Sequence, residues 1–159
     1  MQLYILRHGI AEDGHPGGRD SDRALTSEGK KKLRDVLRVA SKAGVAPKMI
    51  VTSPYVRAVE TAEIAADVLG YKDSLLRTDA LVPSSETAAV WEELRVHRDT
   101  SELMLVGHEP LLSQSVAFLL AAPSMFVDLK KGALVRIDLD QFGVHPKGVL
   151  KWMLVPKLV

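Results

Sequence analysis

Short apolar runs alternate along the chain with stretches in which apolar residues recur at helical spacing, and this alternation limits the fold more than any other feature. The runs at 3–6, 49–51 and 103–106 are continuous, as is typical of strands that are covered on both faces. Strands that alternate with helices predict an α/β fold, in which a mostly parallel central sheet carries helices on both faces.

Capping residues indicate where the helices begin. A serine or threonine suits the position before a helix, and proline suits its first turn. The expected starts are Thr26 or Ser27, the pair Ser53-Pro54, Ser84 or Ser85, and Pro110. Gly44 and Gly70 follow the first two helical patterns, and glycine is the usual residue just past the end of a helix.

The last part of the chain has a different pattern. The segments 133–139 and 149–155 read as strands that flank a turn around Gly143 and Gly148, so we expect a hairpin-like pair and an antiparallel edge to the sheet. The segment 13–21, rich in glycine, aspartate and proline, is the one plausible loop insertion. Because no linker interrupts the pattern, we expect a single domain over residues 1–159.

Composition excludes several classes of function. The 159 residues include no cysteine, which excludes disulfides, thiolate metal sites and a cysteine nucleophile. The 21 basic and 20 acidic residues give a net charge of +1, so there is no electrostatic reason to expect a nucleic-acid or membrane-surface binder. No apolar run approaches the roughly 18 residues of a membrane span, and the first residues do not form a signal peptide. We therefore expect a cytoplasmic protein.

Arginines and histidines follow the ends of the three buried strands. The first strand ends in Arg7-His8, the second leads into a helix with Arg57 in its first turn, and the third ends in Gly107-His108. In open α/β sheets, ligands bind outside the carboxyl ends of the strands. Two guanidinium groups and two imidazoles at one sheet edge predict an anion site, because arginine presents paired donors that suit phosphate.

The available nucleophiles point to histidine. There is no Gly-x-Ser-x-Gly and no Gly-x-x-x-x-Gly-Lys, and the Asp138-Leu139-Asp140 sequence lies in the late hairpin. An imidazole can accept a phosphoryl group if its attacking nitrogen is deprotonated. Neighbouring arginines should lower the pKa of such a histidine, and a backbone carbonyl near Gly9 could hold the proton of its other nitrogen.

The same residues are compatible with two alternative functions. The two histidines could ligate zinc together with Glu109 or Asp22, although the flanking arginines would repel the cation. Alternatively, the chain could bind a phosphorylated ligand without catalysis, although such a binder would need only the arginines.

Four segments, in order from residue 3 to about residue 120, resemble the histidine phosphatase superfamily, whose fold is that of the phosphoglycerate mutases. They are Leu6-Arg7-His8-Gly9, Leu25-Thr26-Ser27-Glu28-Gly29, Ser53-Pro54 to Thr61-Ala62, and Val106-Gly107-His108. The resemblance implies a phosphatase in which His8 is the phosphorylated nucleophile. It also implies that Arg7 and Arg57 bind the phosphoryl group and that His108 stabilises it during transfer.

Within that superfamily, the short chain is similar to the SixA-type protein-phosphohistidine phosphatases. The sequence Asp22-Arg23-Ala24-Leu25-Thr26 resembles that subgroup and implies Arg23 as a further phosphate ligand, although Asp20 and Asp22 are alternative partners for its charge. The subgroup implies a signalling function with a phosphorylated partner protein, such as a histidine phosphotransfer domain. We expect no cofactor and no metal, and a monomer or weak dimer.

The chain departs from the wider family at one point. Many members have a glutamate general acid just after the segment near Leu81, whereas here Glu86 comes later and reads as a first-turn helix residue. Cleavage of a P–N bond needs less acid help than expulsion of a sugar alkoxide. The sequence therefore favours a phosphohistidine substrate, with a small-molecule phosphomonoester as the alternative. We also expect Arg57 and His108 to lie outside the core.

Overall fold

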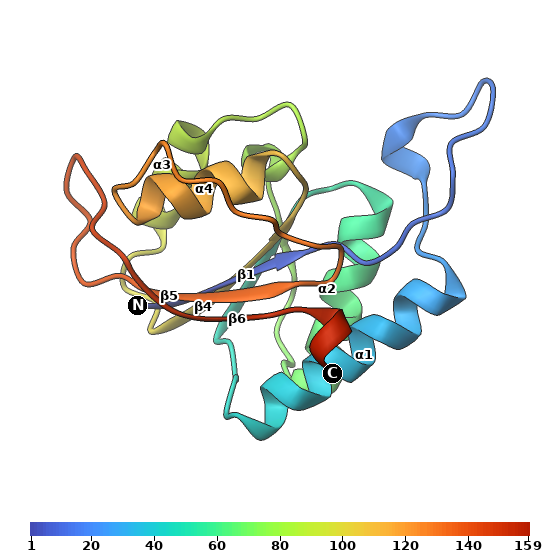
Figure 1. Ribbon diagram of the computed structural model, residues 1–159, viewed down its shortest axis with the longest axis horizontal. Helices are drawn as coiled ribbons and strands as arrows, with labels where there is room; N and C mark the ends of the chain where they lie inside the picture. Colours follow the sequence, from blue (N-terminus) through green and yellow to red (C-terminus); the bar gives the residue numbers. More distant parts are fainter.

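A six-stranded sheet forms the centre of the computed structural model, which describes residues 1–159 (Figure 1). The strands are β1 (Gln2–Arg7), β2 (Met49–Thr52), β3 (Leu76–Arg77), β4 (Glu102–Gly107), β5 (Leu134–Asp138) and β6 (Val149–Leu154), in the spatial order β3-β2-β4-β1-β5-β6. Strands β3, β2, β4 and β1 are parallel, and β5 and β6 are antiparallel to their neighbours. The predicted α/β fold with an antiparallel edge is confirmed.

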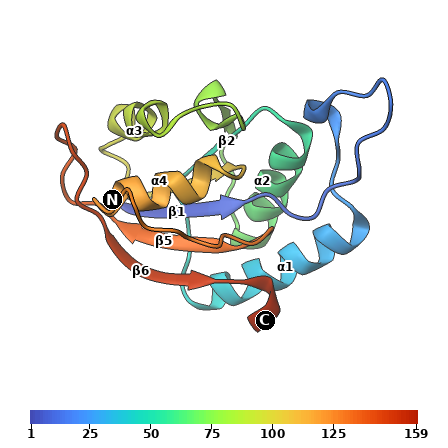
Figure 2. The same cartoon turned by 45° about the horizontal axis from the view of Figure 1, so that its top comes forward.

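Four helices cover the two faces of this sheet. They are α1 (Ser27–Lys42), α2 (Val56–Leu69), α3 (Thr87–Val96) and α4 (Leu111–Leu119). Helices α1 and α2 lie on one face, and α3 and α4 lie on the other (Figures 1 and 2). Three short 3-10 turns, Asp20–Asp22, Asp79–Leu81 and Pro156–Leu158, complete the regular structure. None of the helices is long and apolar enough to cross a membrane.

Strand β1 shows why its residues form a continuous apolar run. Side chains alternate between the two faces of a strand. Leu3 and Ile5 pack in the core beneath α3 and α4, and Tyr4 and Leu6 pack in the second core beneath α1 and α2. Both faces of the strand are thus apolar, as the sequence pattern indicated.

The register of the parallel strands sets the position of their ends. Arg7 of β1 lies opposite Gly107 of β4, and Thr52 of β2 lies opposite Val106 of β4. The carboxyl ends of three strands therefore meet at one edge, and the residues that follow them emerge together.

Helix α1 begins as expected and also holds the chain beyond β1. The Thr26 hydroxyl caps the helix by accepting a hydrogen bond from the Gly29 N–H, at 2.9 Å. The Ile10 carbonyl accepts a hydrogen bond from the Thr26 N–H at 2.9 Å, and a Cβ atom at Gly29 would overlap the Ile10 backbone. The threonine and the glycine of the Leu25–Gly29 segment therefore let the loop after His8 pack against the start of α1.

Two predicted helix starts are wrong. Helix α2 begins at Val56 rather than at Ser53-Pro54, because Tyr55 has an extended backbone and the Ser53 hydroxyl is used elsewhere. Helix α3 begins at Thr87 and has Glu86, which forms no capping bond, at its N-cap position. Neither Ser84 nor Ser85 caps it, since the Ser85 N–H bonds the Val82 carbonyl and closes a turn before the helix. The two-residue strand β3, which is exposed, carries no apolar run and was not predicted.

Candidate active site

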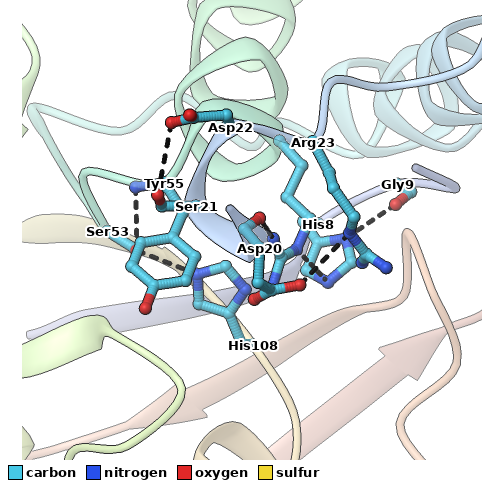
Figure 3. Close-up of polar contacts among 10 residues, drawn as sticks. His8, Gly9, Asp20, Ser21, Asp22, Arg23, Ser53, Tyr55 and His108 are labelled. Carbon is cyan, nitrogen blue, oxygen red and sulfur yellow. Dashed lines mark hydrogen bonds and ion pairs between the residues drawn. The ribbon is translucent and has the colours of Figure 1, made fainter. Parts of the chain in front are cut away.

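The sheet edge brings the predicted histidines and one predicted arginine into contact. His8 follows β1, His108 follows β4, and the centroids of their rings lie 5.1 Å apart. Arg57 is the second residue of α2, and its Nε donates to Nε2 of His8 at 3.3 Å. In the view of Figure 3, the side chain of Asp20 lies between the rings of His8 and His108.

The His8 ring is fixed by its own neighbour in the chain. Nδ1 lies 2.7 Å from the Gly9 carbonyl oxygen, which can only accept a hydrogen bond, so Nδ1 carries the proton (Figure 3). This is the backbone contact that the sequence predicted near Gly9. Nε2 then carries no proton, and its lone pair accepts the hydrogen bond from Arg57 Nε.

Burial and charge keep His8 neutral. Burial lowers the pKa of His8 most strongly, and the charges of Arg57 and Arg7 lower it further, against the opposing effect of the Gly9 hydrogen bond. The result is a pKa of about 4, compared with an ordinary value of 6.5. The predicted direction is confirmed, but loss of hydration contributes more than the arginines.

His108 is held by a residue that the sequence analysis treated only as a helix cap. Its Nε2 lies 2.8 Å from the Ser53 hydroxyl, and its buried Nδ1 has no hydrogen-bond partner. Burial, followed by the neighbouring His8 ring and the charge of Arg57, lowers the pKa of His108 to about 3. The serine that follows β2 thus orients the histidine that follows β4.

Arg57 and His108 are buried, contrary to expectation. Their exposed fractions are only 4% and 1%. Arg57 can be buried because its guanidinium bonds Nε2 of His8 as well as the carbonyl and carboxylate of Asp20, so most of its donors have partners. The burial of a charged group depends on such partners, which lie far away in the sequence.

Arg7 forms no hydrogen bond with either histidine, but its charge lowers the pKa of both. Its Nη1 donates to the Leu129 carbonyl at 2.7 Å, and its buried Nε has no partner. The Gly132 N–H bonds the carbonyls of Arg7 and His8, at 3.1 and 3.0 Å. The segment that leads into β5 therefore fixes the backbone at the end of β1.

The loop that was predicted as an insertion delivers a carboxylate to the site. Asp20 Oδ2 lies 3.0 Å from Arg57 Nη2, and Asp20 Oδ1 lies 3.2 Å from Arg23 Nε. Partial burial raises the pKa of Asp20, but the hydrogen bond and charge of Arg57 and the charge of Arg23 outweigh it and lower the pKa. Arg23, the fifth predicted residue, thus reaches the site through an ionised Asp20. The sequence showed two aspartates beside Arg23 but did not indicate which one turns inward.

Two residues of the Ser53–Ala62 segment support the loop that follows β1. The Thr61 hydroxyl accepts a hydrogen bond from the Gly9 N–H at 3.2 Å and donates to the Arg57 carbonyl at 2.7 Å. Glu60 accepts from the Leu25 N–H at 2.6 Å and pairs with Lys30 at 3.0 Å. In the sequence, these contacts were indicated only by the position of Glu60 and Thr61 within the segment that resembles the known family.

The acidic residues that the sequence offered for other roles form no hydrogen bond or ion pair with His8 or His108. Asp22 pairs with Arg19, and the Glu109 carboxylate accepts a hydrogen bond from the Ser113 N–H. No three histidine, cysteine, aspartate or glutamate side chains lie close enough together to hold a metal ion. Glu86 forms no hydrogen bond or ion pair with Arg7, His8, Arg57 or His108.

The arrangement combines neutral imidazoles with guanidinium groups. Two of its buried nitrogens, Nε of Arg7 and Nδ1 of His108, lack partners, and buried polar groups are rarely left so. An anion with several acceptor oxygens would supply those partners. A phosphoryl group has the charge and the oxygens that such a site requires.

Comparisons with known proteins agree with this geometry. A profile of the histidine phosphatase superfamily (branch 1) matches residues 3–81. An uncharacterized protein of Picosynechococcus sp. (strain PCC 7002) is 34% identical over 165 residues, which cover 99% of this chain and 98% of that protein. The phosphohistidine phosphatase SixA of Escherichia coli (strain K12) is 28% identical, over 98% of this chain and 94% of that protein. A solved structure of the protein histidine phosphatase SixA in complex with tungstate superposes with a TM-score of 0.87 and 27% identity, over 99% of each chain.

Proposed function

Since this chain belongs to the histidine phosphatase superfamily and is a SixA-like phosphatase, we propose that it removes phosphate from a phosphohistidine on a partner protein. The proposed reaction passes through a phosphohistidine intermediate on His8. The observation that carries this proposal is the 2.7 Å contact between His8 Nδ1 and the Gly9 carbonyl, which leaves Nε2 unprotonated and facing the cations.

The nucleophile is ready at neutral pH. An imidazole attacks only through a deprotonated nitrogen, and the lowered pKa of His8 keeps it neutral over the whole physiological range. Arg57 Nε now donates to the attacking nitrogen. When a phosphoryl group arrives, this donor is in place to turn to a phosphoryl oxygen.

The surrounding donors stabilise the transferring group. Arg57 and Arg7 supply guanidinium charge, and Arg23 is a further ligand once it is released from Asp20. If the Ser53 hydroxyl donates to His108 Nε2, the free Nδ1 of His108 carries a proton and becomes a donor to the phosphoryl group. Donors that are fixed before the reaction lower the barrier, because they need no reorientation as charge develops.

The proposed reaction has two chemical steps. His8 Nε2 forms a bond to phosphorus while the P–N bond to the substrate histidine breaks, and the departing imidazole keeps the proton that it already carries on its other nitrogen. A water molecule then attacks the phosphorus of phospho-His8, and the electrons of the second P–N bond return to Nε2. The water protons leave with inorganic phosphate as H2PO4⁻, and His8 keeps its Nδ1 proton. The products are a free histidine on the partner, phosphate and regenerated His8.

The ionised carboxylate near the site is compatible with an imidazole leaving group. Asp20 is the carboxylate beside Arg57, and its lowered pKa keeps it ionised, so at neutral pH it has no proton to give to an alkoxide. A protonated imidazole leaves without such help, whereas a sugar oxygen does not. The chain between β2 and β4 holds only α2, β3, a 3-10 turn and α3, which provides little material for walls around a small substrate.

A substrate panel with an active-site variant tests the proposal. The panel contains a histidine phosphotransfer domain phosphorylated in vitro, a phosphosugar, a phosphoglycerate and a chromogenic aryl phosphate. The wild type should have its highest kcat/KM on the phosphodomain. His8→Asn should lose turnover on every substrate and lose an acid-labile phosphoenzyme, while His15→Asn, at an exposed histidine, should retain both.

Two outcomes would contradict the proposal in different ways. Near-normal turnover by His8→Asn would exclude His8 as the nucleophile. A higher kcat/KM for the phosphosugar or the phosphoglycerate than for the phosphodomain would instead favour a small-molecule phosphatase with the same chemistry.

A further inference from the structure

A basic groove lies next to the active site. Its volume is about 910 Å3, and it runs between the first half of α1, the segment before β5 and the C-terminal 3-10 turn. Figure 2 shows that turn beside α1, at the β6 edge of the sheet. We call this groove the lysine groove, because four lysines line it together with Arg7: Lys32, Lys130, Lys131 and Lys157.

Positive charge is concentrated in the lysine groove. Five cations and one carboxylate, Asp128, line it, and with Glu28, which pairs with Lys32, the local charge is +3 in a chain whose total is +1. Lys130 pairs with Asp128 at 2.8 Å, and Lys32 pairs with Glu28 at 2.7 Å. Neither Lys131 nor Lys157 has an ion-pair partner. Such a concentration attracts an acidic partner and accelerates its association.

Apolar side chains also line the groove. They are Ile10, Met153 and Val155, and Met153 is 43% exposed although it belongs to a strand of the central sheet. A groove lined by both lysines and exposed apolar side chains matches an amphipathic helix that has one apolar stripe flanked by acidic residues.

Arg7 joins the groove to the candidate active site, because it lines the groove and directly precedes His8. Gly132, which follows Lys131, bonds the carbonyls of both Arg7 and His8. A helix seated in the groove would therefore lie beside the position at which a phosphohistidine must enter.

From these observations we propose that the lysine groove docks an acidic, amphipathic helix of the phosphoprotein substrate, next to its phosphohistidine. This inference rests on the proposed function, because it assigns a docking surface to the same reaction. The groove would contribute to binding the protein substrate and would contribute nothing to the hydrolysis of a small phosphate ester.

A charge-reversed enzyme tests the inference. In Lys130→Glu/Lys157→Glu, kcat/KM for a phosphorylated histidine phosphotransfer domain with acidic residues around its histidine should fall roughly tenfold, with most of the loss in KM. The kcat/KM for an aryl phosphate should change less than twofold. The matched control is Lys48→Glu/Lys72→Glu, which changes net charge equally at two exposed lysines away from the groove. It should behave as the wild type.

Changing the substrate completes the experiment. When the acidic residues around the histidine of the carrier are replaced by their amides, the groove variant and the wild type should hydrolyse it at similar rates. Equal loss in the groove variant and the control variant would overturn the inference. So would an unchanged kcat/KM for the acidic carrier together with weaker binding to anionic vesicles. If the wild type hydrolyses the aryl phosphate but no phosphohistidine carrier, the proposed function itself fails.

Discussion

Asp20 is bound to Arg57 by two groups: its carboxylate Oδ2 lies 3.0 Å from Arg57 Nη2, and its backbone carbonyl accepts a hydrogen bond from Arg57 Nη1 at 2.7 Å. Asp20 also pairs with Arg23 and lies close enough to His108 to act on its pKa. An ionised carboxylate therefore takes up the guanidinium donors that a phosphoryl group would use. The side chain of Asp20 is 57% exposed, so it can move away into solvent.

We expect Asp20→Asn to bind inorganic phosphate or tungstate roughly three to five times more tightly than the wild type, because an exposed charge interaction is worth up to about 1 kcal/mol. Isothermal titration calorimetry at constant ionic strength measures the affinity. Asp22→Asn is the matched control, since Asp22 lies two residues away and pairs with Arg19 instead. Equal affinity of the two variants would show that Asp20 does not compete for the anion.

The protonation state of His8 can be observed directly. Because burial and the nearby arginines lower its pKa to about 4, the ring should remain neutral with its proton on Nδ1 at pH 5.5. Nitrogen NMR of the labelled histidines distinguishes the tautomers and the protonated form. The same chain unfolded in urea provides the reference, in which histidine titrates near 6.5. A folded-state midpoint near 6.5 for His8 would contradict the expectation.

The same pKa shift should make folding stability depend on pH. A histidine whose pKa is lower in the folded state binds a proton more readily when the chain unfolds, so stability is present above about pH 6.5 and is lost as the pH falls toward 4. For His8 alone the loss between pH 7 and pH 4.5 should be about 2 kcal/mol. Urea unfolding at the two pH values measures it. His8→Asn should show a pH dependence smaller by about that amount, and an unchanged dependence would refute the assignment.

Thr61 should act as a positioning residue for the loop that carries His8. Thr61→Val removes the acceptor of the Gly9 N–H and the donor to the Arg57 carbonyl, while it keeps the shape of the side chain. A buried N–H left without a partner costs about 1–3 kcal/mol, so we expect lower stability and a lower kcat on an aryl phosphate, with little change in KM. Thr61→Ser, which retains the hydroxyl, should restore most of the kcat. A wild-type kcat in Thr61→Val would show that these hydrogen bonds do not position the loop.

The sheet edge could be predicted from the sequence because the ends of buried parallel strands lie together. Once the runs at 3–6, 49–51 and 103–106 are recognised as strands, His8, Arg57 and His108 must emerge at one place. The resemblance to a known family supported this prediction, because the four matching segments occur in the same order along the chain.

The remaining parts of the site depend on contacts that no local pattern records. Asp20 and Asp22 are chemically equivalent in the sequence, and only the 3-10 turn that contains them decides which one faces Arg57. Ser53 was read as a helix cap because Ser-Pro favours that position, but His108 competes for its hydroxyl. The Leu129 carbonyl that holds Arg7 lies more than a hundred residues away along the chain.

The position of β1 in the sheet determines how the site responds to partial unfolding. Strand β1 is paired on both edges, with β4 on one side and β5 on the other, and both of its faces are covered by helices. Such a strand exchanges its amide hydrogens only when the whole domain opens. The backbone that carries His8 should therefore stay in place through every local fluctuation, whereas the loop that carries Asp20 can open by itself. Opening of the Asp20 loop, which gives an anion access to the site, and unfolding of β1, which displaces His8, would then be separate events. The second would require a much larger free energy than the first.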